Sequence, residues 1–160
     1  MVKSRICLLL LLWLLLVVVL VPVRAQNWDW DLGLGAMLTL TNAVANLGEL
    51  KTDPLNPLFE YFEAENAISF SVFVLFREWQ VLLSGTDFVS GVERIPLEQL
   101  EWKMRDGTYR RMPAPGRNQE IMRVSGIGLY SGNLSFRLVL AGDERPGLYN
   151  STLTLTLVNP

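Results

Sequence analysis

Residues 133–158 read NLSFRLVLAGDERPGLYNSTLTLTLV, and the fold class follows from this stretch. Apolar side chains alternate with polar ones in both arms of the stretch, residues 133–140 and 149–158. Such alternation is typical of strands with one buried and one solvent-exposed face. Pro146 and Gly147 supply a turn between the arms. The stretch therefore predicts a β-hairpin whose apolar face must be covered by a second sheet. The alternating apolar positions are Leu134, Phe136, Leu138, Leu140, Tyr149, Leu153, Leu155 and Leu157.

The rest of the chain contains shorter stretches whose patterns predict strands. Residues 32–40 alternate, residues 67–76 are apolar enough for a central strand, and residues 78–83 continue that strand past a bulge. Residues 100–104 alternate again, and Asp106 with Gly107 marks a hairpin that returns towards residue 112. Residues 121–124 indicate a short strand, residues 126–132 a loop, and residues 58–63 either helical turns or an irregular crossover. About seven to eight strands of this spacing predict an all-β antiparallel sandwich.

The first 25 residues have the features of a secretory signal peptide. Lys3 and Arg5 precede an apolar run over residues 7–21, Pro22 breaks the run, and Ala25 ends a small-residue cleavage site. An uncleaved membrane anchor is the alternative, since the run is close to the length that spans a bilayer. We expect cleavage, a secreted or surface-exposed protein without membrane contact, and one domain over residues 26–160.

The composition of residues 26–160 limits the partners. Eleven basic residues stand against 16 acidic ones, which gives a net charge of −5. This acidic balance argues against nucleic acid and anionic membranes as partners. The single cysteine, Cys7, lies in the predicted signal peptide, so no disulfide is expected and stability must come from the core and the sheets.

The sequence contains few candidate catalytic residues. The sequence has no histidine, and residues 26–160 have no cysteine, so the commonest general base, thiol nucleophiles and zinc ligands are missing. We therefore predict a non-enzymatic protein without catalytic, metal or cofactor residues. Two acidic pairs, Asp29 with Asp31 and Asp143 with Glu144, leave calcium binding open. The remaining clustered carboxylates are predicted to be solvated surface groups: Glu60, Glu63, Glu65, Glu98 and Glu101.

Three short motifs resemble a known family. They are DERPGLY at residues 143–149 before the last alternating strand, WQVLLSGTDF at residues 79–88 with IPLEQLEW at residues 95–102, and LGEL at residues 47–50. Together they resemble bacterial secreted β-sandwich proteins of the spore coat protein U and fimbrial-subunit type, over most of residues 36–158. The resemblance implies an immunoglobulin-like sandwich exported to the surface as a building block, without catalytic residues. Members of that group commonly carry cysteines, which residues 26–160 lack.

The first functional hypothesis is an extracellular structural protein, a subunit of a filament or coat that assembles by strand exchange. Residues 26–45 then form an N-terminal donor segment that completes the sheet of another copy or of another surface protein. The alternative is that this segment forms the first strand of its own sandwich, because strands usually pair locally. The candidate donor side chains are Leu32, Leu34, Ala36, Leu38 and Leu40.

The second hypothesis is a carbohydrate-binding or adhesive module. It depends on Trp28 and Trp30, which face the same way if their segment is extended, and on Tyr109 and Tyr130. Exposed aromatic rings of this kind stack on polysaccharides. The alternative for the two tryptophans is that they pack on the sandwich or on a neighbouring subunit.

Overall fold

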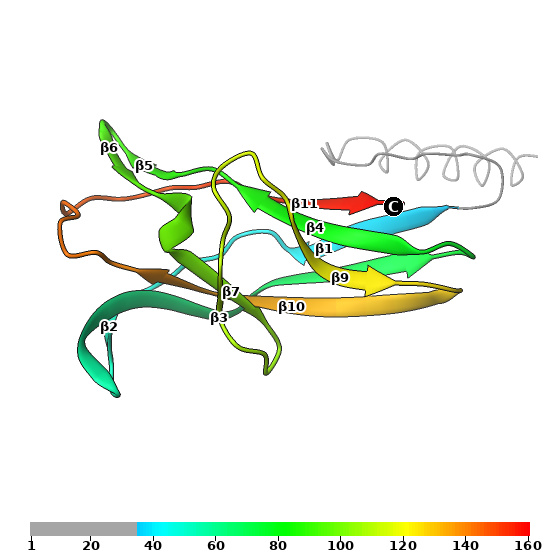
Figure 1. Cartoon of the computed structure of the whole chain (residues 1–160), viewed down its shortest axis with the longest axis horizontal. Helices are drawn as coiled ribbons and strands as arrows, with labels where there is room; N and C mark the ends of the chain where they lie inside the picture. The colour runs from blue at the N-terminus through cyan, green and yellow to red at the C-terminus, as the bar shows by residue number, and fades with distance from the viewer. Residues whose placement is uncertain (1–34) are drawn as a thin grey trace, which may run out of the picture.

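The computed structural model describes residues 35–160, which form an immunoglobulin-like antiparallel β-sandwich (Figure 1). The predicted signal peptide and the candidates Trp28, Trp30, Leu32 and Leu34 lie outside the described residues. Over residues 35–160 there is no helix with the length and apolar character needed to cross a membrane. The elements are β1 (Ala36–Asn42), β2 (Leu50–Asp53), β3 (Asn56–Val74), β4 (Trp79–Gly85), β5 (Phe88–Ser90), β6 (Glu93–Ile95), the 3-10 turn η1 (Leu97–Gln99), β7 (Leu100–Met104), β8 (Arg110–Arg111), β9 (Gln119–Val124), β10 (Gly128–Val139) and β11 (Leu153–Val158).

Two sheets face each other across the core. The larger sheet has the order β1-β3-β10-β7-β8, with β2 beside β3, and the smaller sheet has the order β11-β4-β9. A separate hairpin joins β5 to β6, and all the pairings are antiparallel. Figure 1 shows the sheets running along the longest axis of the molecule. Eleven strands are found within the described residues, more than the seven or eight predicted, because four of them have only two to four residues.

The core lies between the inner faces of the two sheets. Phe70, Val72 and Val74 of β3 are at most 1% exposed, and Val81 and Leu83 of β4 face them from the smaller sheet with no exposed surface. The alternation predicted for residues 133–140 is confirmed, since Leu134, Phe136 and Leu138 of β10 are all buried. The central position predicted for residues 67–76 is also confirmed, because β3 lies between β1 and β10.

A bulge bends the long strand β3 near its middle. The register against β10 shifts between Leu134 and Phe136, and Asn66 on β3 has a φ of 49°. Asparagine tolerates this left-handed conformation better than most residues. The Asn66 N–H donates to the Oγ of Ser135, 3.0 Å away, and Ser135 is only 2% exposed. The buried hydroxyl therefore satisfies the main-chain donor that the bulge releases from the ladder.

The hairpin predicted for residues 133–158 is wrong. Its first arm is β10 in the larger sheet, paired with β3 and β7, whereas its second arm is β11 in the smaller sheet, paired with β4. Both alternating patterns are real, but their apolar faces meet across the core instead of lying side by side. Residues 140–152 therefore connect the two sheets. The apolar face of β10 is therefore covered by the smaller sheet, and the apolar face of β11 by the larger sheet.

Three local predictions are also corrected. Residues 126–132 were expected to be a loop, but β10 begins at Gly128. Residues 58–63 belong to strand β3 instead of a helix or an irregular crossover, because β2 and β10 pair with both of its edges there. Residues 78–83 do not continue β3, because the chain turns at Phe76 and enters the other sheet as β4. The predicted hairpin at Asp106 and Gly107 is confirmed by the pairing of β7 with β8.

Candidate functional site

Three of the five candidate donor residues lie in a strand of their own chain. Ala36, Leu38 and Leu40 belong to β1, which pairs with the second half of β3. Their partners on β3 are Val74, Val72 and Phe70. β1 therefore occupies the edge of the larger sheet, and its outer side has no strand partner among residues 35–160.

The outer edge of β1 carries free main-chain groups at alternate residues. The Leu75 N–H donates to the Gly35 carbonyl at 3.2 Å, which makes this directly opposed pair a hydrogen-bonded one. Hydrogen-bonded and non-bonded pairs alternate along an antiparallel ladder. Met37 and Thr39 therefore direct their main-chain groups towards β3, and Ala36, Leu38 and Leu40 direct theirs outwards.

β11 forms the corresponding edge of the smaller sheet. The Thr86 N–H donates to the Thr152 carbonyl at 3.1 Å, just before β11 begins. By the same alternation, Thr154 and Thr156 bond to β4. The main-chain groups of Leu153, Leu155 and Leu157 then face away from the sheet, where no strand among the described residues pairs with them.

The two free edges lie next to each other. Cα atoms of β1 and β11 come within 8 Å, and Figure 1 shows the two strands side by side at the same rim of the sandwich. No ladder joins them within residues 35–160. We call this region the β1–β11 seam and define it by six residues with outward main-chain groups: Ala36, Leu38, Leu40, Leu153, Leu155 and Leu157.

The core reaches the surface along this seam. The side chains of the six seam residues point towards the interior, yet Leu153, Leu155 and Leu157 are only half-buried and Leu40 is 46% exposed. On the opposite rim, residues 112–118 connect β8 to β9, and Met112 is 2% exposed there. β9 is also an edge strand, but its inward side chains Ile121 and Val124 are only 7% and 4% exposed, whereas the seam combines unpaired main chain with half-exposed leucines. Such an edge is a template for strand addition.

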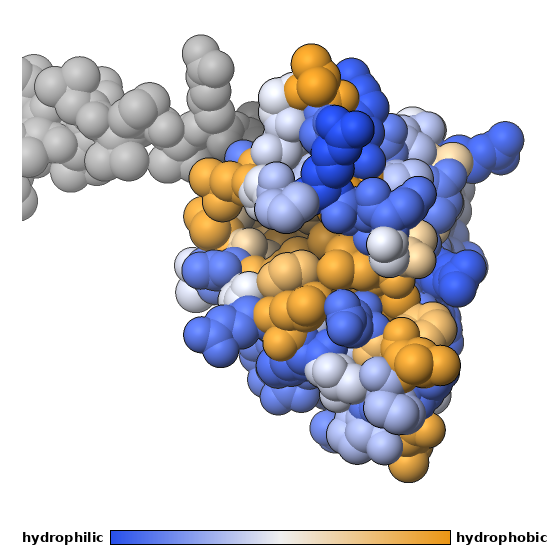
Figure 2. All heavy atoms as spheres, turned by 90° about the vertical axis from the view of Figure 1, so that its left-hand side faces the viewer, coloured by the Kyte–Doolittle hydropathy of each residue, from blue (hydrophilic) through white to orange (hydrophobic). Residues whose placement is uncertain are grey.

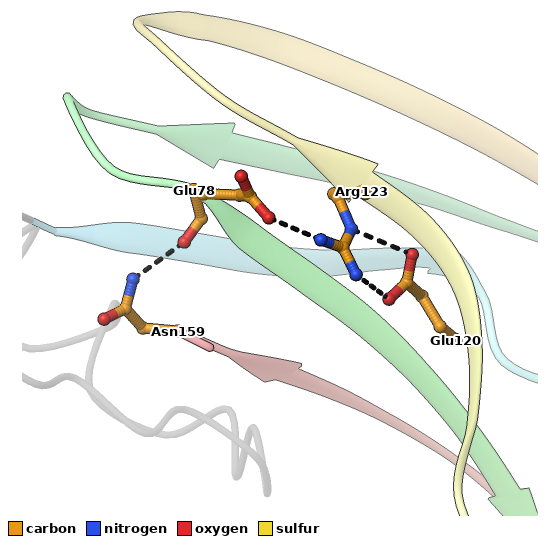
Figure 3. A network of polar contacts seen from close by, with 4 residues as sticks. All are labelled: Glu78, Glu120, Arg123 and Asn159. Atoms are coloured by element: carbon orange, nitrogen blue, oxygen red, sulfur yellow. Dashed lines mark hydrogen bonds and ion pairs between the residues drawn. The ribbon is translucent and has the colours of Figure 1, made fainter.

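An exposed ion-pair network holds the end of β11 in place. Asn159, just after β11, donates its Nδ2 to the Glu78 carbonyl at 2.7 Å, and the Glu78 carboxylate accepts from Arg123 of β9 at 2.7 Å (Figure 3). Arg123 also binds Glu120 through two nitrogens. This hydrogen bonding lowers the pKa of Glu120 and raises that of Arg123. The contacts join residues next to the ends of β4 and β11 to β9 at one end of the smaller sheet.

A second polar cluster covers the outer face of the larger sheet. The Arg137 guanidinium binds Glu101 and lies 5.3 Å from the ring centroid of Tyr61 and 4.3 Å from that of Tyr109. The Tyr109 hydroxyl donates to Glu63 at 2.6 Å. Burial and the Glu63 carboxylate both raise the pKa of Tyr109. The cluster joins β3, β7 and β10 to the loop after β7. It contains Glu63 and Glu101, which the sequence predicts to be solvated but whose side chains are each only 15% exposed.

Glu63 gives this cluster a testable pH dependence. Burial favours a raised pKa, but the Tyr109 hydroxyl and Lys51 at 3.2 Å outweigh it and hold the pKa of Glu63 below its usual 4.5. The folded state therefore binds this proton less readily than the unfolded state, so the stabilisation is present above about pH 4.5 and is lost as the pH falls below it. We expect the melting temperature of Glu63→Gln to fall less than that of the wild type between about pH 7 and about pH 3. Thermal unfolding followed by circular dichroism measures both slopes.

The exposed Glu98 gives the control for this experiment, since its carboxylate lies outside the cluster. Glu98→Gln should keep the wild-type slope. Equal acid slopes for the wild type and Glu63→Gln would contradict the role given to Glu63.

The aromatic candidates for sugar binding are not brought together. Lys103 and Arg137 both lie over the Tyr109 ring, at 4.7 and 4.3 Å from its centroid. Tyr130 lies on β10 and donates its hydroxyl to the Ser125 carbonyl at 2.6 Å. The hypothesis of a sugar platform therefore depends on Trp28 and Trp30, outside the described residues.

Glu144, one of the acidic residues considered for calcium binding, has a structural role. The Glu144 carboxylate accepts hydrogen bonds from the main-chain N–H groups of Ala141 and Gly142 and from the side chain of Gln99. These bonds outweigh burial and lower the pKa of Glu144. Among residues 35–160, no group of three or more acidic, histidine or cysteine side chains is placed to hold a metal ion.

The end of the sandwich at the left of Figure 1 also exposes apolar side chains. Figure 2 faces this end and shows apolar residues gathered in its middle and at its extremities, with polar residues around them. Four of the exposed apolar residues belong to β2, β3 and the turn between them: Leu50, Leu55, Leu58 and Phe59. They lie on a projecting hairpin and not along the rim of the core, so we place the candidate site at the seam.

Comparison with known proteins adds one structural likeness. No family model matches the chain, and no curated protein sequence matches it. A solved structure of a chaperone–tip adhesin complex in the biogenesis of CFA/I fimbriae contains a similar chain, with a TM-score of 0.45 and 11% sequence identity. The similarity covers 77% of this chain and 42% of that one, so this chain spans less than half of its length. The resemblance to spore coat protein U remains a prediction from the sequence motifs.

Proposed function

We propose that this chain is a non-enzymatic structural protein of the cell surface that assembles with further copies of itself by strand exchange. The observation that carries the proposal is the β1–β11 seam, where two neighbouring edges leave main-chain groups unpaired and leucines half-exposed. The predicted signal peptide supports export. An added strand in the seam would pair with at least one free edge and cover the leucines.

The segment before β1 has the pattern that such a strand requires. Apolar residues continue the even-numbered register of β1 backwards through Leu34, Leu32, Trp30 and Trp28, and Gly33, Asp31 and Asp29 alternate with them. Even-numbered side chains of β1 point to the core, so the segment repeats the register of a core strand. Burying one tryptophan removes about 150–250 Å² from water, which corresponds to roughly 4–6 kcal/mol at most.

The test compares the two faces of this segment in the full-length chain. We expect the wild-type secreted protein to form oligomers or fibres in light scattering and negative-stain microscopy. The variant Trp28→Ser/Trp30→Ser/Leu32→Ser should be monomeric, because it lacks the side chains that enter the seam. The matched control Asp29→Asn/Asp31→Asn changes the opposite face and should assemble like the wild type. A monomeric wild type, as expected if the segment fills its own seam, or an assembling triple variant would overturn the proposal.

A further inference from the structure

An exposed apolar row crosses the outer face of the larger sheet at the end where β1 begins. Met37, Phe73 and Leu129 are direct cross-strand neighbours on β1, β3 and β10. Their side chains are 41%, 37% and 72% exposed. The next row on the same face is polar, because Thr39, Ser71 and Ser131 oppose one another there. The apolar row is therefore a bounded feature of one end of the sheet.

Two further exposed apolar side chains lie just beyond the strands at this end of the sheet. Phe76, two residues after β3, is 65% exposed, and Ile127, one residue before β10, is 62% exposed. Phe76 also has a φ of 61°, a backbone conformation that is strained for a bulky residue. We name the five residues Met37, Phe73, Phe76, Ile127 and Leu129 the end patch. Exposed apolar clusters rimmed by polar residues are typical of protein interaction sites.

We propose that the end patch binds a second copy of this chain, namely the copy that receives the N-terminal segment in its seam. This inference rests on the proposed function. The end of Figure 1 at which β1 begins also holds the end of β3 and the start of β10, so the end patch lies where residues 26–34 join the fold. Ala36 is paired with Val74, and Val74 with Gly128. Phe73 and Leu129 are the adjacent residues in the two strands.

The length of the segment places the second copy against this end. Residues 26–34 span at most about 30 Å when fully extended. If residues 28–34 pair along a seam, only Gly35 remains as a linker before β1. The body of the receiving copy must then abut the end of the donor, and the end patch is the apolar surface available there. Interfaces with an apolar centre and a polar rim are common between protein subunits.

The closing experiment uses the absence of cysteine from residues 26–160. In Leu129→Cys, a benzophenone maleimide can be attached at a single position of the end patch. Illumination of the assembled protein should give covalent dimers, and mass spectrometry should locate the crosslink on a different copy. The control Asn118→Cys carries the same label at an exposed position between β8 and β9 and should give far fewer dimers. A label at position 129 that reacts only within its own chain would overturn the inference.

A pair of variants separates this inference from the proposed function. Ile127→Asp/Leu129→Asp adds charge to the end patch at two positions that are more than 60% exposed, so the fold is retained. We expect assembly to require at least tenfold more protein. Thr39→Asp/Ser131→Asp places the same charges on the polar row and should assemble like the wild type. If the serine triple variant is monomeric while the end-patch variant assembles normally, the end-patch inference fails and strand exchange stands. If the end-patch variant alone loses assembly, strand exchange fails, and with it the inference that the bound copy is the one that receives the segment.

Discussion

Replacing Phe70 by alanine is expected to lower the free energy of unfolding by about 3–5 kcal/mol. Phe70 is 1% exposed in the central strand β3, and its cross-strand partner on β10 is Gly132. A Cβ atom at Gly132 would lie 2.5 Å from Cζ of Phe70, so the ring occupies the space above the glycine. Alanine leaves a cavity that Gly132 has no side chain to fill. A loss of this size is a large part of the roughly 5–15 kcal/mol that stabilises a typical domain.

Urea unfolding of the monomeric serine triple variant, followed by circular dichroism, measures this loss without assembly. Phe70→Leu serves as the control, because leucine keeps most of the apolar volume and should cost less than half as much. An alanine variant that loses less than about 1 kcal/mol would show that the Phe70 ring is not packed as described.

Proline substitutions in β11 are expected to have unequal effects on stability at neighbouring residues. Thr156→Pro removes an N–H that bonds to β4 and leaves the opposite carbonyl of Leu82 without its donor, so the loss should be about 2 kcal/mol or more beyond that of Thr156→Ala. Leu155→Pro removes an N–H that faces the seam. Its stability should stay within about 1 kcal/mol of Leu155→Ala, which loses a similar amount of side chain.

Assembly separates the same variants in a second way. Leu155→Ala keeps the outward N–H and should still assemble at raised protein concentration. If the added strand pairs with β11, Leu155→Pro should not assemble. Unfolding curves and light scattering measure the two properties. Equal assembly of Leu155→Pro and Leu155→Ala would mean that the outer edge of β11 takes no part in strand exchange.

The sequence predicted those parts of the fold that depend on local pattern. Alternation along residues 133–140 and 153–158 correctly predicted two strands and their buried faces, and Asp106 with Gly107 correctly predicted the β7–β8 hairpin. The pairing of strands that are distant in the chain could not be predicted in this way. β11 pairs with β4, which lies about 70 residues earlier in the chain, and alternation contains no information on that choice. The turn residues between β10 and β11 therefore predict a hairpin that the structure does not form.

The seam could not be predicted from the sequence, because alternation does not specify which strands pair. Leu153, Leu155 and Leu157 were recognised as an apolar face, but whether their main-chain groups are free depends on which strand lies beside β11. The bulge at Asn66 shows a related limit, because its N–H is satisfied by Ser135, a residue far away in the chain. The sequence does not identify residues 58–63 as a strand, because an aromatic-rich run such as LFEYFE suits a short helix as well as a strand.

Amide hydrogen exchange, measured by NMR, tests the central claim that the seam is open in one copy and filled by another. In the monomeric serine triple variant, the amides of Ala36, Leu38, Leu40, Leu153, Leu155 and Leu157 should exchange fast, while those of Met37, Thr39, Thr154 and Thr156 are protected. Adding a peptide of residues 26–35 should protect at least one of the two fast sets. The account is contradicted if the six amides are already protected in the monomer, or if the peptide leaves their exchange unchanged.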